Sequence, residues 1–326
     1  MRILNSFRSN REKRFLKEWE ILVFACLEND PSVRELLNKI PKRKYKYFLE
    51  YVREYLITLS GEDFLKLSRL ITSTNFSSYL LKRLNSSNTN KVIFSSFFIG
   101  ISNIEEAKPL LLHKIKTHNE QIFFSCASAL AKMNSYESLG IILEEFNQYK
   151  QFGYEYLLLI LTEYDEKICE EIIPLIKPNQ PEQLIITFIR LLRFYKYYNG
   201  GQSVLTTLIY SYSKEIIIEC LRFIEETKYI NAISAVSRLI EHSKPEIKSQ
   251  AIKTLVRLDN KNFEDKIYSK LFENNYDVQY QAAYALLNFC EDGEDRLSEL
   301  AYDVQKSSTS AISRMLLSEK KIKDGK

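Results

Sequence analysis

Apolar residues recur in the C-terminal third of the chain at a spacing that keeps them on one side of a helix. Ile247, Ala251, Leu255 and Leu258 are separated by 4, 4 and 3 residues, which aligns their side chains in one stripe. The same order returns 31 residues later, at Val278, Ala282, Leu286 and Phe289. The sequence therefore predicts the same helix twice, each copy with a small residue that lets a neighbouring helix approach closely.

A second, shorter helix is expected between these two copies. The connecting segment, NFEDKIYSKLFENN, places Ile267, Leu271 and Phe272 on one face. A single helix pair cannot bury its own apolar faces, so each pair must stack on the next one. The pattern predicts an all-α fold, a right-handed α-solenoid of stacked antiparallel helix pairs.

The period of 31 residues extends toward the N-terminus. Stepping back from residue 247, the anchors are Ile216, Ile185, Gly153, Ile122 and Lys91. Every step is 31 residues except the one from Ile185 to Gly153, which is 32. The small position of the stripe is taken by Cys220, Cys126 and Ser95. Self-similarity at a fixed period of this length is typical of repeat architectures. The array is therefore expected to cover most of the chain, with degenerate matches at Gly153 and Lys91.

Two of these segments carry a resemblance to a known repeat. PEIKSQAIKTLVRL and YDVQYQAAYALLNF resemble the inner helix of a HEAT repeat, and NIEEAKPLLLHKI, from Asn103, resembles the turn and second helix of such a unit. The resemblance covers about residues 60–310 and implies a HEAT-like solenoid. Many HEAT proteins carry an Arg after the Val or Ile, paired with an acidic residue of the adjoining unit. Lys248 and Gln279 stand at that position here, so the resemblance implies no arginine ladder.

Three parts are expected along the chain. Residues 1–60 form a basic N-terminal segment with capping helices, residues 61–310 form the repeat array, and residues 311–326 form a C-terminal tail. Within the array, KPNQP at 177–181 predicts a sharp corner. The Gly-Gly pair in YKYYNGGQ, residues 195–202, predicts a flexible link between two helices.

Basic residues gather at the start of a helix that precedes the array. This helix carries an apolar stripe from Tyr45 to Leu59 and is expected to end at Gly61. Its first turn contains Lys42, Arg43, Lys44 and Lys46. The helix dipole disfavours a cation there by about 0.3–1 kcal/mol. The cluster is therefore a candidate site for an anionic partner, although basic residues are also ordinary solubilising groups.

A second candidate binding segment is RLLRFYKYYNGG, which begins at Arg190 and mixes cations with aromatics. Its candidate contact residues are Arg190, Arg193, Tyr195, Lys196 and Tyr198. Cations neutralise phosphate and aromatic rings stack on bases or sugars. The favoured interpretation is structural: Phe194 and Tyr197 pack within the repeat, while the basic residues face water.

Composition and charge exclude several classes of protein. A hydrophobic content of 45% argues against disorder, and eight Gly and seven Pro are too few for an all-β chain rich in turns. The net charge is +4. Residues 1–50 hold twelve basic and seven acidic side chains, so the rest of the chain is close to neutral.

No catalytic, cofactor or metal motif is present in the sequence. The three histidines show no metal-binding spacing, and no CxxC pair, phosphate loop or GxSxG elbow occurs. The five cysteines are far apart and are expected to be buried free thiols in a reducing compartment. No secretory signal or membrane-spanning run is recognised. We expect a non-enzymatic protein without cofactors, located in the cytoplasm or at the inner face of the membrane.

Three functional hypotheses are compatible with these observations. The leading hypothesis is a non-catalytic scaffold or adaptor that binds a protein partner, because stacked helix pairs offer an extended concave surface. The second rests on RSNREKRFLKEWEILVFACLEND, which resembles the segment after the membrane anchor in bacterial HEAT-repeat proteins. It implies a membrane-associated accessory protein, linked to a glycosyltransferase or polysaccharide-synthesis system, whose basic N-terminus contacts an anionic membrane surface or membrane protein.

The third hypothesis is a HEAT-like DNA glycosylase or nucleic-acid binder. Such proteins use aromatic and acidic side chains in a cleft of the solenoid. The chain has one tryptophan, Trp19, which precedes the array, and the array is nearly neutral. The absence of a basic stripe disfavours nucleic-acid binding.

Overall fold

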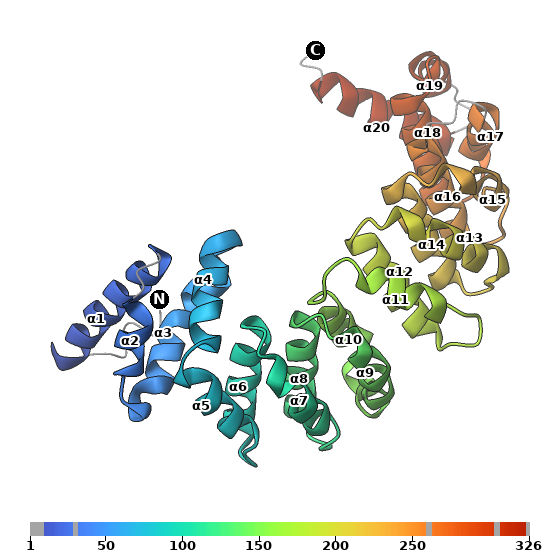
Figure 1. Cartoon of the computed structure of the whole chain (residues 1–326). Helices are drawn as coiled ribbons and strands as arrows, with labels where there is room; N and C mark the ends of the chain where they lie inside the picture. Colours follow the sequence, from blue (N-terminus) through green and yellow to red (C-terminus); the bar gives the residue numbers. More distant parts are fainter. Residues whose placement is uncertain (1–9, 29–31, 259–262, 303–306, 324–326) are drawn as a thin grey trace. The chain divides into compact units, whose positions relative to one another are not determined.

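The chain folds into helices that follow one another in stacked pairs (Figure 1). A computed structural model describes residues 10–28, 32–258, 263–302 and 307–323, and no strand occurs among them. The predicted all-α architecture of stacked helix pairs is confirmed. Residues 1–9 and 29–31 of the expected N-terminal segment lie outside the described residues.

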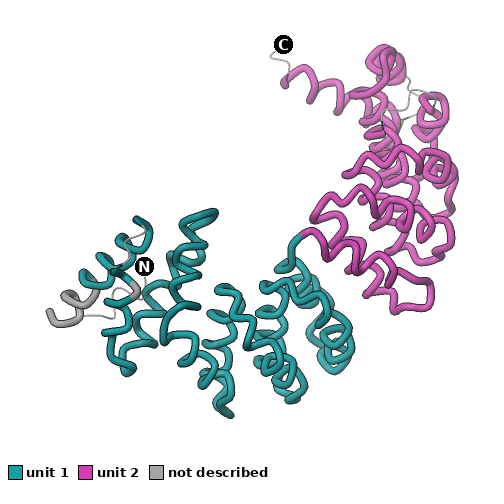
Figure 2. The backbone as a smooth tube through the Cα atoms, viewed as in Figure 1, with its two compact units in different colours: residues 1–165 teal, residues 166–326 magenta. Residues whose placement is uncertain are grey.

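The structure divides into two compact units, residues 1–165 and 166–326 (Figure 2). Unit 1 contains α1 (Asn10–Leu27), α2 (Val33–Asn38), α3 (Tyr45–Thr58), α4 (Gly61–Thr72), α5 (Asn75–Leu84), α6 (Thr89–Ile101), α7 (Lys108–Ile115), α8 (Glu120–Lys132), α9 (Leu139–Phe146) and α10 (Tyr154–Leu161). Unit 2 contains α11 (Ile168–Ile172), α12 (Glu182–Phe194), α13 (Gly201–Tyr210), α14 (Lys214–Thr227), α15 (Ile233–Leu239), α16 (Pro245–Arg257), α17 (Glu264–Ser269), α18 (Tyr276–Phe289), α19 (Gly293–Ala301) and α20 (Ser307–Lys323). The expected division at residues 60 and 310 stays a prediction.

The 31-residue period corresponds to a repeated helix start. Asn88, Asn119, Ser213 and Asn275 are the N-cap residues of α6, α8, α14 and α18, and each side chain accepts a hydrogen bond from the backbone amide three residues later. That amide belongs to the residue that the period predicted as the anchor. Each such cap contributes about 1 kcal/mol. At these four helices a polar cap therefore marks the same register as the apolar stripe, whereas α12 and α16 have no side-chain cap.

The small position of the predicted stripe is fully buried. The residues at this position are each 0% exposed: Ser95, Cys126, Cys220, Ala251 and Ala282. The anchor at Lys91 is exposed, and its neighbour Val92 is buried instead. Phe272 and Phe289, both expected on buried faces, are 39% and 43% exposed, so these two predictions were wrong. Both are the last residue of a helical segment.

Two expectations about glycine were also wrong. Gly200 and Gly201 are buried with φ of −70° and −57°, which any residue can adopt. A Cβ on Gly201 would lie 2.3 Å from the Tyr229 ring, and one on Gly200 would lie 2.9 Å from Leu192. Close packing, rather than flexibility, explains the Gly-Gly pair. Gly61 does not end α3, since it begins α4 with a left-handed φ of +61°.

The longer helices of unit 2 form one row. Helices α12, α14, α16 and α18 each pack on the next, and the shorter α13, α15, α17 and α19 pack behind them. We refer to α12, α14, α16 and α18 as the long-helix row. The final helix, α20, packs on α18 and α19, and Ile312 and Leu316 are buried there. The row positions polar side chains from successive repeats next to one another.

Candidate partner-binding surfaces

The basic cluster predicted near the N-terminus lies at an uncapped helix start. Lys42–Lys44 form a short 3₁₀ turn, and α3 begins directly after it. No side chain caps α3, and its first turn contains no acidic residue. Lys46 lies 3.5 Å from Glu50 in an exposed ion pair, which contributes at most about 1 kcal/mol. The cluster therefore presents positive charge at this end of α3.

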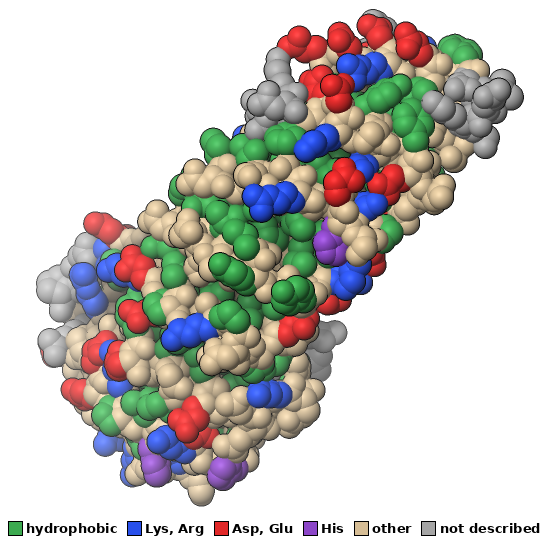
Figure 3. Space-filling view, turned by 90° about the vertical axis from the view of Figure 1, so that its right-hand side faces the viewer, with side chains coloured by type: hydrophobic (Ala, Val, Ile, Leu, Met, Phe, Trp, Pro, Cys, Tyr) green, Lys and Arg blue, Asp and Glu red, His purple; other side chains and the backbone are tan. Residues whose placement is uncertain are grey.

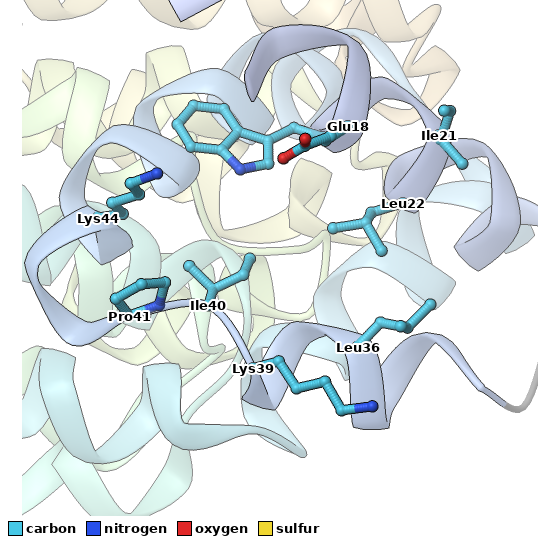
Figure 4. A pocket seen from close by; sticks show the side chains of 9 residues that line it. Glu18, Ile21, Leu22, Leu36, Lys39, Ile40, Pro41 and Lys44 are labelled. Atoms are coloured by element: carbon cyan, nitrogen blue, oxygen red, sulfur yellow. The ribbon is translucent and has the colours of Figure 1, made fainter. Parts of the chain in front are cut away.

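An apolar cavity of about 360 Å³ lies beside this cluster (Figure 4). Its lining residues are Glu18, Trp19, Ile21, Leu22, Leu36, Lys39, Ile40, Pro41 and Lys44. The Trp19 indole is held in place because it is buried and meets the Phe48 ring edge-on at 5.8 Å. Lys39 and Lys44 lie at the edges, beside apolar side chains. The sequence did not predict this cavity, because α1 meets the basic turn only through tertiary packing.

A buried carboxylate organises the arginine-rich segment of unit 2. The Glu219 side chain on α14 is 5% exposed and lies 2.6 Å from Arg193, 2.8 Å from Arg222 and 3.4 Å from Arg190. A buried charge without such partners would be strongly destabilising. Burial disfavours the charge on Arg193, but hydrogen bonds and attraction from Glu226 and Glu219 raise its pKa overall. The network ties α12 to α14.

The other candidate residues of this segment make ring contacts or are exposed. Tyr195 meets the Phe194 ring edge-on at 4.9 Å. Tyr198 packs on Tyr229, which follows α14, at 5.2 Å. Lys196 is exposed and has a left-handed φ of 49° in the turn after α12. The role of these five candidates in binding a partner stays a prediction.

The favoured structural interpretation of this segment was wrong in two respects. Phe194, expected to pack inside the repeat, is 61% exposed. Arg193, expected to face water, has a side chain only 22% exposed and pairs with two glutamates. Sequence analysis did not identify Glu219 as important. The one sign of its role was its place directly before the buried Cys220 in EIIIECLRF. Apolar patterning assigns such a residue to the surface, although paired arginines let it be buried.

Lys248 and Gln279, which stand where HEAT proteins commonly carry arginine, both make side-chain contacts. The Lys248 ammonium donates to both carboxylate oxygens of Glu273, at 2.8 and 2.6 Å. The Gln279 amide donates to the Ser308 hydroxyl at 3.2 Å. Lysine and glutamine therefore make polar contacts from this position without arginine, and the Gln279 contact joins α18 to α20.

A polar groove of about 300 Å³ crosses α14, α16 and α18. Its lining residues are Ile218, Arg222, Glu246, Ser249, Gln250, Lys253, Asp277 and Gln281. The set contains two cations, two carboxylates, two amides and a hydroxyl, so it offers both hydrogen-bond donors and acceptors. The groove lies on the long-helix row, next to the Glu219 network through Arg222.

The cysteines are all free thiols, and Cys26, Cys126, Cys169 and Cys220 are buried. Burial raises the pKa of Cys126 to about 11 and that of Cys169 to about 12. A raised pKa leaves little reactive thiolate at neutral pH. Among the described residues, no group of three His, Cys, Asp or Glu side chains could hold a metal ion.

Two solved structures share the arrangement of the helices. The karyopherin Kap121p bound to the SUMO protease Ulp1p matches 94% of this chain, with a TM-score of 0.54 and 13% identity. Kap121p bound to RanGTP matches 96% of the chain, with a TM-score of 0.51 and 13% identity. The fold is that of a HEAT-repeat α-solenoid. This confirms the resemblance seen in the sequence.

The likeness concerns the fold alone, because the chain spans 42% of either karyopherin chain and shares few identical residues with it. No family model and no curated protein sequence matches the chain. Within the described ranges, every helix is too short or too polar to cross a bilayer.

Proposed function

We propose that this chain is a non-catalytic adaptor that binds a protein partner along the long-helix row of unit 2. The observation that carries the proposal is the groove across α14, α16 and α18, where Arg222, Lys253, Glu246 and Asp277 lie together. A polypeptide segment offers both charges as well as backbone donors and acceptors. The groove therefore suits a polypeptide segment, since protein–protein interfaces contain about one hydrogen bond per 100–200 Å² of interface area.

Charge favours a protein over a nucleic acid as the partner. A phosphate backbone would meet the carboxylates of Glu246 and Asp277 beside the two cations, and nucleic-acid affinity depends mainly on phosphate neutralisation. Acidic and basic side chains are also interspersed on the face shown in Figure 3. Mixed charge of this kind gives specificity for a complementary protein surface.

The ion-pair ladder supports the same proposal because it holds the row rigid before binding. Glu219 joins α12 to α14, and Lys248 on α16 joins Glu273 just before α18. Side chains that are already ordered lose less conformational freedom when a partner binds. The likeness to Kap121p, whose solved complexes contain Ulp1p or RanGTP, supports protein binding as the general role.

A second contact is proposed at the basic turn Lys42–Lys44 with Lys46. The apolar cavity beside it has cationic edges at Lys39 and Lys44, so it fits an amphipathic segment with acidic residues. The membrane hypothesis predicts binding of the full chain to vesicles that contain anionic lipid at low salt. Vesicle binding abolished by Lys42→Glu/Arg43→Glu would favour the membrane hypothesis over a protein contact here.

Site-specific photo-crosslinking in the native source tests the proposal for unit 2. A photoreactive residue at Ser249 in the groove should give a discrete adduct with one polypeptide, and Lys253→Glu should reduce that adduct at least about tenfold. The matched controls lie on α15, where Ser234 and Arg238 are exposed. A probe at Ser234 should give no such adduct, and Arg238→Glu should leave the groove adduct unchanged. A nuclease-sensitive adduct, or none from the groove, would overturn the proposal.

A further inference from the structure

The first helix of unit 1 carries apolar residues on two opposite faces. Trp19, Val23 and Cys26 of α1 are 6%, 0% and 8% exposed, and they face the rest of the unit. On the opposite face, Ile21 is 67% exposed and Phe24 is 51% exposed. A helix on the surface of a folded protein usually carries polar residues on its outer face. The exposed Ile21 and Phe24 therefore make the outer face of α1 a candidate surface for contact with another protein molecule.

A stripe of six residues defines this outer face, and they line a shallow groove along α1: Lys17, Glu20, Ile21, Phe24, Ala25 and Glu28. Four of the six, at positions 17, 21, 24 and 28, are separated by 4, 3 and 4 residues. This is the spacing of a two-helix coiled-coil seam. Glu28 continues the helical geometry, since its amide donates to the Phe24 carbonyl at 2.9 Å. The seam has two large apolar residues at its centre and opposite charges at its ends.

This order of residues is self-complementary about a two-fold axis. If a second copy of α1 runs antiparallel across the seam, with the axis midway between Ile21 and Phe24, each Ile21 lies opposite Phe24 of the other copy. The same axis places each Lys17 opposite Glu28 of the other copy. Both contacts then occur twice, as in any isologous interface. A parallel arrangement would instead bring Lys17 against Lys17 and Glu28 against Glu28.

We propose that two copies of this chain associate through the outer faces of α1, packed antiparallel about this axis. The charge complementarity of Lys17 and Glu28, on either side of the exposed Ile21 and Phe24, selects a second copy as the occupant. The proposal is independent of the partner-binding groove, because α1 belongs to unit 1 and the groove belongs to unit 2. A dimer would carry two long-helix rows and hold two partners at once.

Sedimentation equilibrium of the full chain over a range of concentrations tests this directly. The natural chain should show a monomer–dimer equilibrium, and Ile21→Glu should weaken dimerisation on the order of 100-fold. Lys17→Glu and Glu28→Lys should each weaken it on the order of tenfold, since two attractive contacts become repulsive. An equimolar mixture of these two variants should restore dimerisation, because each contact then joins an acidic side chain of one variant to a basic side chain of the other. High salt should reduce this restoration.

Matched variants separate the seam from general effects on solubility. Ile57 on α3 is 59% exposed and Lys150 is exposed, so Ile57→Glu and Lys150→Glu should leave the dimer intact. Unchanged far-UV circular dichroism in every variant excludes misfolding. A monomer at all concentrations, or a dimer insensitive to Ile21→Glu, would overturn the proposal. A mixture of the two charge variants that stays monomeric would overturn the antiparallel geometry.

Discussion

Lys248 on α16 and Glu273, which lies in the turn before α18, make a bidentate contact. The Lys248 ammonium donates to both carboxylate oxygens at 2.8 and 2.6 Å, and the two side chains are only 16% and 24% exposed. Glu273 also lies 3.3 Å from Lys270, which pairs with Glu241 of the preceding pair. This cluster carries charge pairing from one repeat to the next.

Removal of the Lys248 charge should destabilise unit 2. Lys248→Met keeps most of the aliphatic stem but leaves Glu273 with one cation fewer, so we expect a loss of about 2 kcal/mol. Chemical unfolding monitored by hydrogen exchange of α16 and α18 would measure it. In a double-mutant cycle with Glu273→Gln, the loss should be clearly smaller than the sum of the single losses. Additive losses would show that the two side chains do not interact.

Acid should weaken the same cluster. Burial works against the charge on Glu273, but hydrogen bonds from Lys248 and Lys270 lower its pKa below the ordinary value overall. The stabilisation is therefore fully present above the pKa of an unfolded glutamate, about 4.3, and is lost as the pH falls through the lower folded value. Melting temperatures measured between about pH 6 and pH 3 should fall less steeply for Glu273→Gln than for the natural chain. Parallel curves would contradict this account.

Replacement of Glu219 should be more damaging than replacement of its exposed neighbour. Glu219→Leu leaves Arg190, Arg193 and Arg222 close together without their shared carboxylate. We expect a loss of about 3 kcal/mol in the free energy of unfolding. The matched control is Glu226→Leu, since Glu226 is 41% exposed and pairs only with Arg193 among the residues described here. That change should cost at most about 1 kcal/mol, and equal losses would argue against the central role of Glu219.

Two glycine substitutions should shift stability in opposite directions. A Cβ on Gly100 in α6 would lie 2.7 Å from the Cα of Ala129 in α8, so Gly100→Ala should destabilise unit 1 by about 1–3 kcal/mol. A Cβ on Gly140 in α9 would meet nothing within 4 Å. Gly140→Ala should therefore stabilise by about 0.5–1 kcal/mol through helix propensity. Thermal melts of both variants give the comparison, and destabilisation by both would contradict the packing argument.

Thiol labelling should distinguish Cys290 from the other cysteines. Cys290 is half-buried and the other four are buried. Burial raises the pKa of Cys290 to about 11 and that of Cys126 to about 11, so exposure rather than acidity should decide the order of reaction. A disulfide reagent at pH 8 should label Cys290 first in the native protein and all five thiols in denaturant. Loss of the first phase in Cys290→Ser confirms the assignment, and its persistence would refute it.

The sequence by itself determined the architecture. Ala251, Ala282 and Cys220 were predicted as the small buried positions of the repeat, and each is fully buried. This worked because a solenoid buries each helix against its sequence neighbours, so the apolar period along the chain is also the period of the fold. The period would not have emerged in a fold whose core joins distant segments.

Only the tertiary structure decided how the polar residues are used. The apolar pattern predicts Glu219 as a surface residue of its helix. It is buried instead, because arginines from α12 and α14 contact its carboxylate. The cavity at Trp19 and the groove at Lys253 likewise combine residues from separate helices. Apolar burial follows a local period, whereas the pairing of charges depends on side-chain reach across helices, which a linear pattern does not encode.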